Sequence, residues 1–257
     1  MLSLRLNALH RSRPEMDSKV LLITGGAKRI GAEIAKKFHD EGFNVILSFQ
    51  SSSAEATEVA SKLNKLRKNS AVAKKINLAK LDTLDLFFRE CQQTFGPLTC
   101  LINNASVFAP TDLKNISATE IRRTLDINLI APILLSKNMA FQKEKSSIIN
   151  ILDIFAVKPL TDYFSYTISK AGLRMATKAL AKELGPNIRV NGVSPGIIIW
   201  PEGDVNKEFM STDIVRGLPL KKKGEPSDIA NACYFLAEAA PFITGEIVTV
   251  DGGQSLN

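Results

Sequence analysis

The sequence is short of the residues that build metal centres and nucleophilic triads. Only two of its 257 residues are histidine, His10 and His39, and only three are cysteine. Cys91, Cys100 and Cys233 are scattered, without a Cys-x-x-Cys pair or a histidine at ligand spacing. These absences argue against a zinc or other metal site and against a histidine-based triad. An odd, sparse set of cysteines predicts reduced thiols and a cytoplasmic protein rather than a disulfide framework.

Long apolar runs and dense basic clusters are missing as well. No apolar run reaches the roughly 18–20 residues that a membrane-spanning helix needs, so we expect no membrane span. Lys and Arg together number 33 against 26 Asp and Glu, but the short lysine run at residues 221–223 has no interleaved aromatics. This argues against a nucleic-acid partner. The net charge of +7 fits an anionic cofactor, and it fits a plain basic surface equally well.

The first fifteen residues differ from the rest of the chain. They carry Arg5, Arg11 and Arg13 among leucines, which faintly resembles a transit peptide. Met16 stands just before the first apolar run and would make a natural start. We therefore expect residues 1–15 to be a disordered extension, with organelle targeting as the alternative. Residues 16–257 are expected to form one domain, because the chain is 45% hydrophobic and 23% charged and shows no internal linker.

Short apolar runs alternate with helix-like periodicity along the whole of this domain. Strands that are apolar throughout belong to a parallel sheet covered by helices on both faces. The pattern predicts a single α/β doubly wound (Rossmann) domain with a parallel sheet of about seven strands. The long connection over residues 197–224 is typical of a lid or binding loop. We expect strands at residues 19–24, 45–47, 71–76, 101–102, 148–152, 188–193 and 247–250, and helices at residues 30–42, 54–66, 81–95, 121–139, 162–185 and 227–238.

One pair of residues suggests acid–base chemistry near the edge where such sheets bind ligands, outside the carboxyl ends of their strands. Tyr166 and Lys170 are four residues apart, so on a helix they share one face. A free phenol titrates near ~10, and a neighbouring ammonium lowers that pKa toward the range for proton transfer. The pair alone also fits a helix with one half-buried tyrosine and one solvated lysine.

A glycine-rich turn from Gly25 to Gly31 follows the first strand and opens the first helix. Glycines let a pyrophosphate approach the backbone, and the helix N-terminus offers unpaired N–H groups, although such a turn can also be structural only. The second strand ends in Ser48-Phe49-Gln50-Ser51-Ser52, without the carboxylate that commonly binds the ribose of NAD. Arg29 adds a fixed positive charge, which favours a 2′-phosphate and therefore NADP(H) over NAD(H).

The ordered set of motifs resembles the short-chain dehydrogenase/reductase family over nearly the whole chain after Met16. The motifs are Thr24-Gly25 to Gly31, Asn103-Asn104-Ala105, Asn128, Tyr166-x-x-x-Lys170, Pro195-Gly196 and Asp251-Gly252-Gly253. The resemblance implies that Tyr166 is the proton donor, that Lys170 lowers its pKa and holds the nicotinamide ribose, and that Asn128 anchors a water relay. It also implies a homo-oligomer, commonly a tetramer.

The same resemblance places Asn104 and Ala105 at the adenine ribose side of the cofactor and Pro195 to Ile197 around its carboxamide. Together with the residues singled out above, the expected cofactor-binding set is Gly25, Arg29, Ile30, Gly31, Ser48, Ser51, Ser52, Asn77, Leu78, Asn104, Ala105, Ser106, Lys170, Pro195, Gly196 and Ile197.

Three positions depart from the family pattern. Arg29 replaces a glycine of the cofactor turn, Asn77 replaces an acid, and Asp153 replaces the catalytic serine. Pteridine reductases share this aspartate, together with Lys-Arg-Ile/Leu-Gly and an Asn-Ala-Ser-x-Phe motif that here ends at Phe108. Trp200-Pro201-Glu202 is also similar to bacterial members. The resemblance thus implies NADPH-dependent reduction of a pterin or folate-like ring.

The expected substrate-binding residues are Ser106, Phe108, Asp153 and Tyr166. Phe108 would stack on one face of the pterin with the nicotinamide on the other, and Asp153 would relay protons through Tyr166 to a ring nitrogen. As alternatives, Phe108 is ordinary core and Asp153 is a helix cap or ion-pair partner. Two other functions stay open: a reductase of a small carbonyl, imine or quinone, and a non-catalytic NADP(H)-binding protein. The second is disfavoured because Tyr166, Lys170 and Asn128 are all present.

Overall fold

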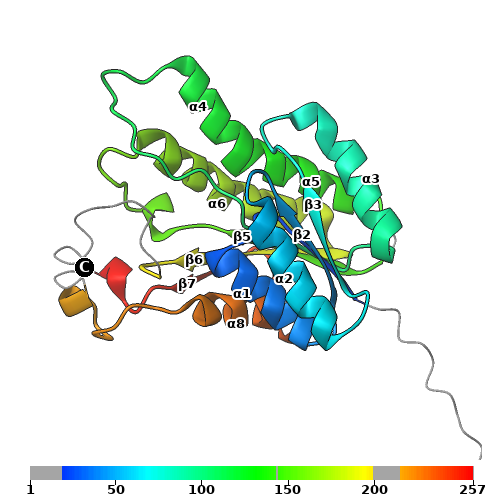
Figure 1. The fold of residues 1–257 in the computed structure, drawn as a ribbon. Coiled ribbons are helices and arrows are strands. Elements are labelled where there is room, and N and C mark those ends of the chain that lie inside the picture. Colours follow the sequence, from blue (N-terminus) through cyan, green and yellow to red (C-terminus); the bar gives the residue numbers. More distant parts are fainter. Residues whose placement is uncertain (1–18, 143, 199–214, 257) are drawn as a thin grey trace, which may run out of the picture.

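Seven strands pair in the order β3-β2-β1-β4-β5-β6-β7, and every pairing is parallel (Figure 1). The structure is a computed structural model that describes residues 19–142, 144–198 and 215–256. β1 pairs with both β2 and β4, so the strand order reverses beside it. The predicted seven-stranded doubly wound sheet is confirmed. The strands are β1 (Val20–Ile23), β2 (Asn44–Phe49), β3 (Ala71–Lys75), β4 (Cys100–Asn103), β5 (Ser146–Ile151), β6 (Ile188–Pro195) and β7 (Ile247–Val250).

Helices cover both faces of the sheet, as the unbroken apolar strands require. One face carries α1, α2 and α8, and the other carries α3, α5 and α6, with α4 beside α6 (Figure 1). Each face has its own buried cluster, one around Phe38 and Val45, the other around Phe88 and Leu101. The helices are α1 (Arg29–Asp40), α2 (Ser53–Leu66), α3 (Leu84–Phe95), α4 (Ala118–Leu125), α5 (Ala131–Met139), α6 (Phe164–Leu184) and α8 (Pro226–Tyr234).

The single long helix expected over residues 121–139 is interrupted. α4 begins earlier, at Ala118, where Ser117 and Glu120 form a reciprocal capping box, and a π-helical turn, η2 (Asp126–Ile130), separates α4 from α5. Pro132 has no N–H, so an α-helical hydrogen bond to the Asn128 carbonyl four residues earlier cannot form. The expected helix over residues 227–238 likewise ends in a π turn, at Phe235–Ala239. Hydrophobic spacing does not distinguish such turns from α-helix.

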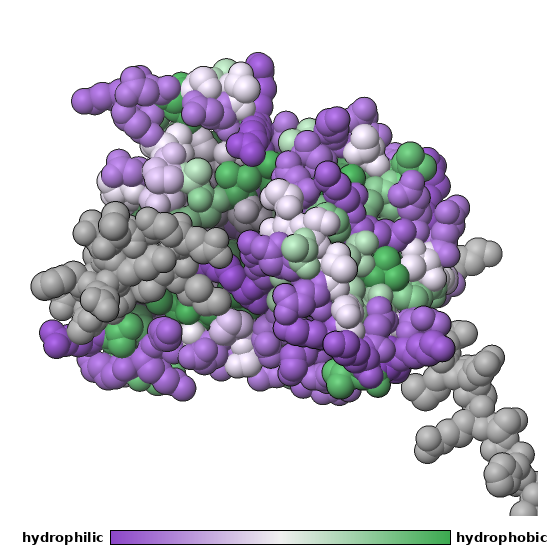
Figure 2. All heavy atoms as spheres, viewed as in Figure 1, coloured by the Kyte–Doolittle hydropathy of each residue, from purple (hydrophilic) through white to green (hydrophobic). Residues whose placement is uncertain are grey.

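Short 3-10 turns occupy Leu81–Thr83, Ile154–Ala156 (η3) and Gln254–Leu256. Residues 1–15, Trp200-Pro201-Glu202 and most of the expected long connection lie outside the described residues. In the part of the chain that is described, no helix is both long and apolar enough to cross a membrane. Hydrophilic side chains cover most of the face seen in Figure 2, and the hydrophobic patches among them are small and scattered.

Candidate active site

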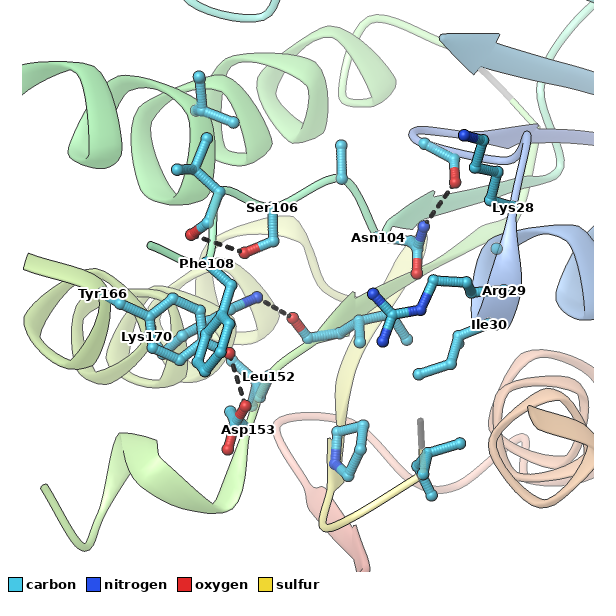
Figure 3. A pocket seen from close by; sticks show the side chains of 18 of the residues that line it. Lys28, Arg29, Ile30, Asn104, Ser106, Phe108, Leu152, Asp153, Tyr166 and Lys170 are labelled. Atoms are coloured by element: carbon cyan, nitrogen blue, oxygen red, sulfur yellow. Dashed lines mark hydrogen bonds between the residues drawn. The ribbon is translucent and has the colours of Figure 1, made fainter. Parts of the chain in front are cut away.

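A cavity of about 500 Å³ opens at the carboxyl edge of the sheet, beside the reversal of strand order between β1 and β4. Doubly wound sheets bind their ligands at this position. Its walls come from the turn after β1, the segments after β4 and β5, helix α6 and the end of β6. Figure 3 shows Lys28 and Arg29 at one end, and Phe108, Tyr166 and Lys170 at the other.

The turn after β1 forms a backbone cradle. Gly25 has a φ of 65°, and a Cβ on Gly31 would lie 2.2 Å from the Gly25 carbonyl oxygen, so glycine is required at both positions. Asn104 Nδ2 donates to the carbonyls of Thr24 and Gly25 at 2.9 Å each, and Thr24 Oγ1 accepts from the N–H groups of Asn104 and Ala105 at 3.0 Å. These bonds fix the turn against the end of β4. The open backbone surface that remains fits the pyrophosphate of a dinucleotide.

Positive charge gathers where α1 begins. Arg29 has a φ of 54°, the left-handed region that favours glycine, so this arginine occupies a strained position in the turn. Lys28 forms an ion pair with Glu55 of α2 at 2.8 Å. The first turn of α1 contains no acidic residue, so the positive end of the helix dipole is not offset from within that turn. This end of the cavity fits a phosphorylated ribose.

At the other end, the Tyr166 hydroxyl donates a 2.5 Å hydrogen bond to Oδ2 of Asp153. The second oxygen of Asp153 accepts from the Phe155 N–H at 2.9 Å and caps η3, so the carboxyl group is held from both sides. Burial raises the pKa of Asp153 above its usual range. Burial and the Asp153 carboxylate raise the pKa of Tyr166 well above 10. Asp153 is therefore a helix cap, one of the expected alternatives, and at the same time the hydrogen-bond acceptor of Tyr166.

Lys170 is buried, with 2% of its surface exposed, and its Nζ donates to the Ile151 carbonyl at 2.8 Å. Burial lowers the pKa of Lys170 to about 8, although Asp153 opposes this shift. Nζ lies 5.8 Å from the centroid of the Tyr166 ring, whereas Asp153 contacts the hydroxyl directly. Burial and the adjacent carboxylate favour the protonated phenol, and the expectation that Lys170 lowers the pKa of Tyr166 stays a prediction.

Asn128 holds the loop that carries Ser106 and Phe108, two residues that line the cavity. Its Oδ1 accepts from the Val107 N–H at 2.8 Å, and its Nδ2 donates to the Val107 carbonyl and to Ser169 Oγ at 3.0 Å each. The side chain is 1% exposed and does not line the cavity. The amide side chain already binds the loop and α6. The water relay expected at Asn128 therefore stays a prediction, and its water would bind the backbone of Asn128.

Phe108 faces the cavity from that loop and is 39% exposed, so it is not ordinary core. Its ring stacks on Tyr163 with centroids 4.4 Å apart and planes 19° apart. The ring also meets Tyr166 in an edge-to-face contact, with centroids 4.7 Å apart and planes 87° apart. Both arrangements are favourable for aromatic pairs. Phe108 thus belongs to an aromatic cluster with Tyr163 and Tyr166.

Comparison with known proteins identifies the family of this chain. The family model described as "Enoyl-(Acyl carrier protein) reductase" matches residues 25–255. Pteridine reductase 1 of Leishmania tarentolae is 34% identical, over 92% of this chain and 96% of that protein. The chain belongs to the short-chain dehydrogenase/reductase family.

Other members of the family differ in what they act on. The 3alpha-hydroxysteroid dehydrogenase of Mediterraneibacter gnavus is 32% identical, over 92% of this chain and 97% of that protein. Among solved structures, FolM alternative dihydrofolate reductase 1 from Brucella canis, complexed with NADP, superposes with a TM-score of 0.85. It is 29% identical and covers 94% of this chain and 96% of its own. The predicted NADP(H) cofactor agrees with that complex.

The cavity brings together most of the residues expected from the family motifs. Ser51, Ser52, Asn77 and Asn128 do not line it. The expected residues that do line it are Gly25, Arg29, Ile30, Gly31, Ser48, Leu78, Asn104, Ala105, Ser106, Phe108, Asp153, Tyr166, Lys170, Pro195, Gly196 and Ile197.

Four further residues belong to the cavity or its surroundings, although the sequence motifs do not single them out. Lys28 and Phe155 line the cavity, and Gln254 both lines it and accepts from the Ile197 N–H at 2.9 Å. Tyr163 stacks on Phe108 without lining the cavity. Gln254 could have been suspected because it directly follows the Asp-Gly-Gly motif, and Lys28 because it lies within the glycine-rich turn. No local signal identifies Tyr163, because its role depends on a loop more than fifty residues away.

Proposed function

We propose that this protein is an NADPH-dependent reductase of a pterin ring, converting a dihydropterin or dihydrofolate-like substrate to the tetrahydro form with Tyr166 as proton donor. The observation that carries the proposal is the 2.5 Å hydrogen bond from Tyr166 to Asp153. Asp153 occupies the position at which the family has a serine. The similarity to pteridine reductase 1 and to a FolM dihydrofolate reductase supports the same substrate class.

The carboxyl group favours proton delivery to nitrogen over reduction of a ketone. A carbonyl reductase needs a hydrogen-bond donor beside the developing oxyanion, and an ionised Asp153 would repel that charge. A ring nitrogen that is reduced must instead take up a proton, which an acid beside Tyr166 can supply. Because burial raises the pKa of Asp153, this carboxyl can hold a proton nearer neutral pH and return one to Tyr166. Tyr166, whose pKa is also raised, stays protonated until it donates.

NADPH would supply the hydride, and the chain offers residues to hold its parts. The Gly25–Gly31 cradle fits the pyrophosphate, and Arg29 with Lys28 would bind the 2′-phosphate. Lys170 is buried beside Tyr166 and would bind the nicotinamide ribose. Phe108, whose ring faces the cavity, would stack on the flat heterocycle and orient it below the tyrosine hydroxyl.

The second candidate function is reduction of another small carbonyl, imine or quinone. The relative that acts on 3alpha-hydroxysteroids favours it, since that protein is nearly as similar to this chain as the pteridine reductase. The two candidates differ in what Asp153 should do for the reaction.

The test is a substrate panel followed by NADPH absorbance. Dihydrobiopterin, dihydromonapterin and dihydrofolate are offered beside simple ketones and quinones, to the wild type and to Asp153→Ser. We expect the wild type to reduce a pterin, and Asp153→Ser to lose about 100-fold or more of kcat/KM for it while NADPH binding is kept. Asp82→Ser, at an exposed carboxylate that does not line the cavity, is the matched control and should behave as wild type. Good turnover of ketones with no turnover of any pterin would contradict the proposal.

A further inference from the structure

Phe108 lies on an irregular stretch between β4 and α4, so no helix or strand fixes its ring. The backbone is held on both sides of it. Before Phe108, the two hydrogen bonds from Asn128 hold Val107. After it, the Thr111 N–H donates to the Asp162 carbonyl at 2.5 Å, and Thr111 forms an isolated parallel bridge with Tyr163. The Phe108 loop is therefore attached to the segment that opens α6, and the side chain depends on its ring contacts.

Two ring contacts hold Phe108, and they come from different directions. Tyr166 meets the ring edge to face, while Tyr163 stacks parallel to it. The described residues that line the cavity include Phe108 and Tyr166 but not Tyr163. Tyr163 therefore covers the side of Phe108 that is turned away from the cavity and leaves the cavity side accessible.

The backbone before Tyr163 is also arranged for this contact. Asp162 has a φ of 62°, in the left-handed region, and Tyr163 follows it directly as the residue that precedes α6. A non-glycine residue keeps that conformation only where its surroundings impose it, and the hydrogen bond from Thr111 to the Asp162 carbonyl is one such constraint. The chain thus turns sharply at Asp162 and presents the Tyr163 ring to Phe108.

We infer that Tyr163 is a positioning residue for substrate: it backs Phe108 and fixes the cavity-facing side of that ring for a planar heterocycle, without touching the heterocycle itself. For the identity of the heterocycle this inference rests on the proposed pterin reductase function. A ring that is held before binding loses less freedom when a flat ligand stacks on it, so the backing contact should appear as substrate affinity. It makes Tyr163 a specificity determinant for flat substrates.

The experiment compares Tyr163→Leu, which keeps apolar volume without a flat ring, with Tyr163→Phe, which keeps the ring and removes the hydroxyl. We expect Tyr163→Leu to raise the KM for a dihydropterin roughly two- to tenfold, the range of a lost aromatic pair, with a smaller change in kcat. The KM for NADPH should change less than about twofold. Tyr163→Phe should restore the wild-type KM. Thermal midpoints of both variants check that they fold.

A double-mutant cycle with Phe108→Ala shows whether Tyr163 acts through Phe108. In a Phe108→Ala background, Tyr163→Leu should no longer change the KM, because the ring it positions is gone. An equal effect in both backgrounds would overturn the inference, and so would a Tyr163→Phe variant as impaired as Tyr163→Leu.

Hydrogen exchange of the loop separates this inference from the proposed function. Amides of residues 105–111 should exchange faster in Tyr163→Leu than in wild type, and at the wild-type rate in Tyr163→Phe. If the wild type reduces no pterin, the proposed function fails and the exchange comparison alone decides the role of Tyr163. Unchanged exchange in Tyr163→Leu would overturn the inference whatever the substrate is.

Discussion

The Tyr166 hydroxyl donates a 2.5 Å hydrogen bond to the Asp153 carboxyl just beyond the end of β5, and burial raises the pKa of both groups. Tyr166→Phe removes only the hydroxyl of this pair. We expect turnover to fall about 100-fold or more, since proton transfer by a positioned side chain contributes at least that factor. The dissociation constant for NADPH, measured by fluorescence titration, should stay within about twofold. Wild-type turnover in this variant would exclude Tyr166 as the donor.

Asp153→Asn should change the pH dependence of stability. The pKa of Asp153 is raised by burial, so above the usual carboxyl pKa of 3.8 the native state binds a proton more tightly than the unfolded chain does. Stability contributed by the protonated acid is then lost as pH rises through this window. Asparagine cannot ionise and can still accept from the Phe155 N–H. The thermal midpoint of the variant should exceed that of wild type by a few degrees at pH 7, with the difference shrinking toward pH 4. A constant difference across this range would contradict the assignment.

Arg29 combines a strained backbone with a charge at the cofactor end of the cavity. Arg29→Gly and Arg29→Ala both remove the charge, and losing a charge-assisted contact of about 1.5–3 kcal/mol should weaken NADPH binding by one to two orders of magnitude. NADH binding should change much less. Only glycine relieves the left-handed φ, so Arg29→Gly should be more stable to urea than Arg29→Ala by about 1 kcal/mol. An equal loss of affinity for NADPH and NADH would show that Arg29 does not bind the 2′-phosphate.

Lys170 has a pKa lowered to about 8 by burial, so its charged form is present below that pH and is lost above it. If the ammonium is needed, kcat/KM should decline about tenfold per pH unit above roughly pH 8, because this parameter reports the free enzyme. Tyr166 cannot cause that decline, since its pKa is raised well above 10. Lys170→Arg keeps its charge at every accessible pH and should lack the decline, although its rate at pH 7 should be lower. The same alkaline decline in Lys170→Arg would assign it to another group.

The helix expected over residues 121–139 illustrates what hydrophobic spacing can and cannot predict. The apolar spacing predicts the packed face of the segment, and the structure has helix there. It does not predict the π turn at Asp126–Ile130, because hydrophobic spacing reports which side chains are buried and not which backbone N–H and C=O groups pair. Pro132 is the one indication of this turn in the sequence, since a proline cannot donate to the carbonyl four residues earlier.

The sequence by itself determined the order of strands and helices, the parallel sheet and the residues that meet at its carboxyl edge. Apolar runs that alternate with helical periodicity allow few other topologies. Parallel strands end at one edge, so Gly25, Asn104 and Asp153 are brought near one another wherever the individual side chains point. For the same reason the family motifs predicted most of the residues that line the cavity.

Only the tertiary structure decided how those residues pair. The sequence left Asp153 as a cap, an ion-pair partner or a proton relay, whereas the fold places it on the Tyr166 hydroxyl. Lys170 donates to the Ile151 carbonyl, and burial lowers its pKa. Tyr163 reaches Phe108 from a segment more than fifty residues later. A hydrogen bond or ring contact requires its partners within a few ångströms, and a pKa depends on burial, so both follow from packing and not from spacing along the chain.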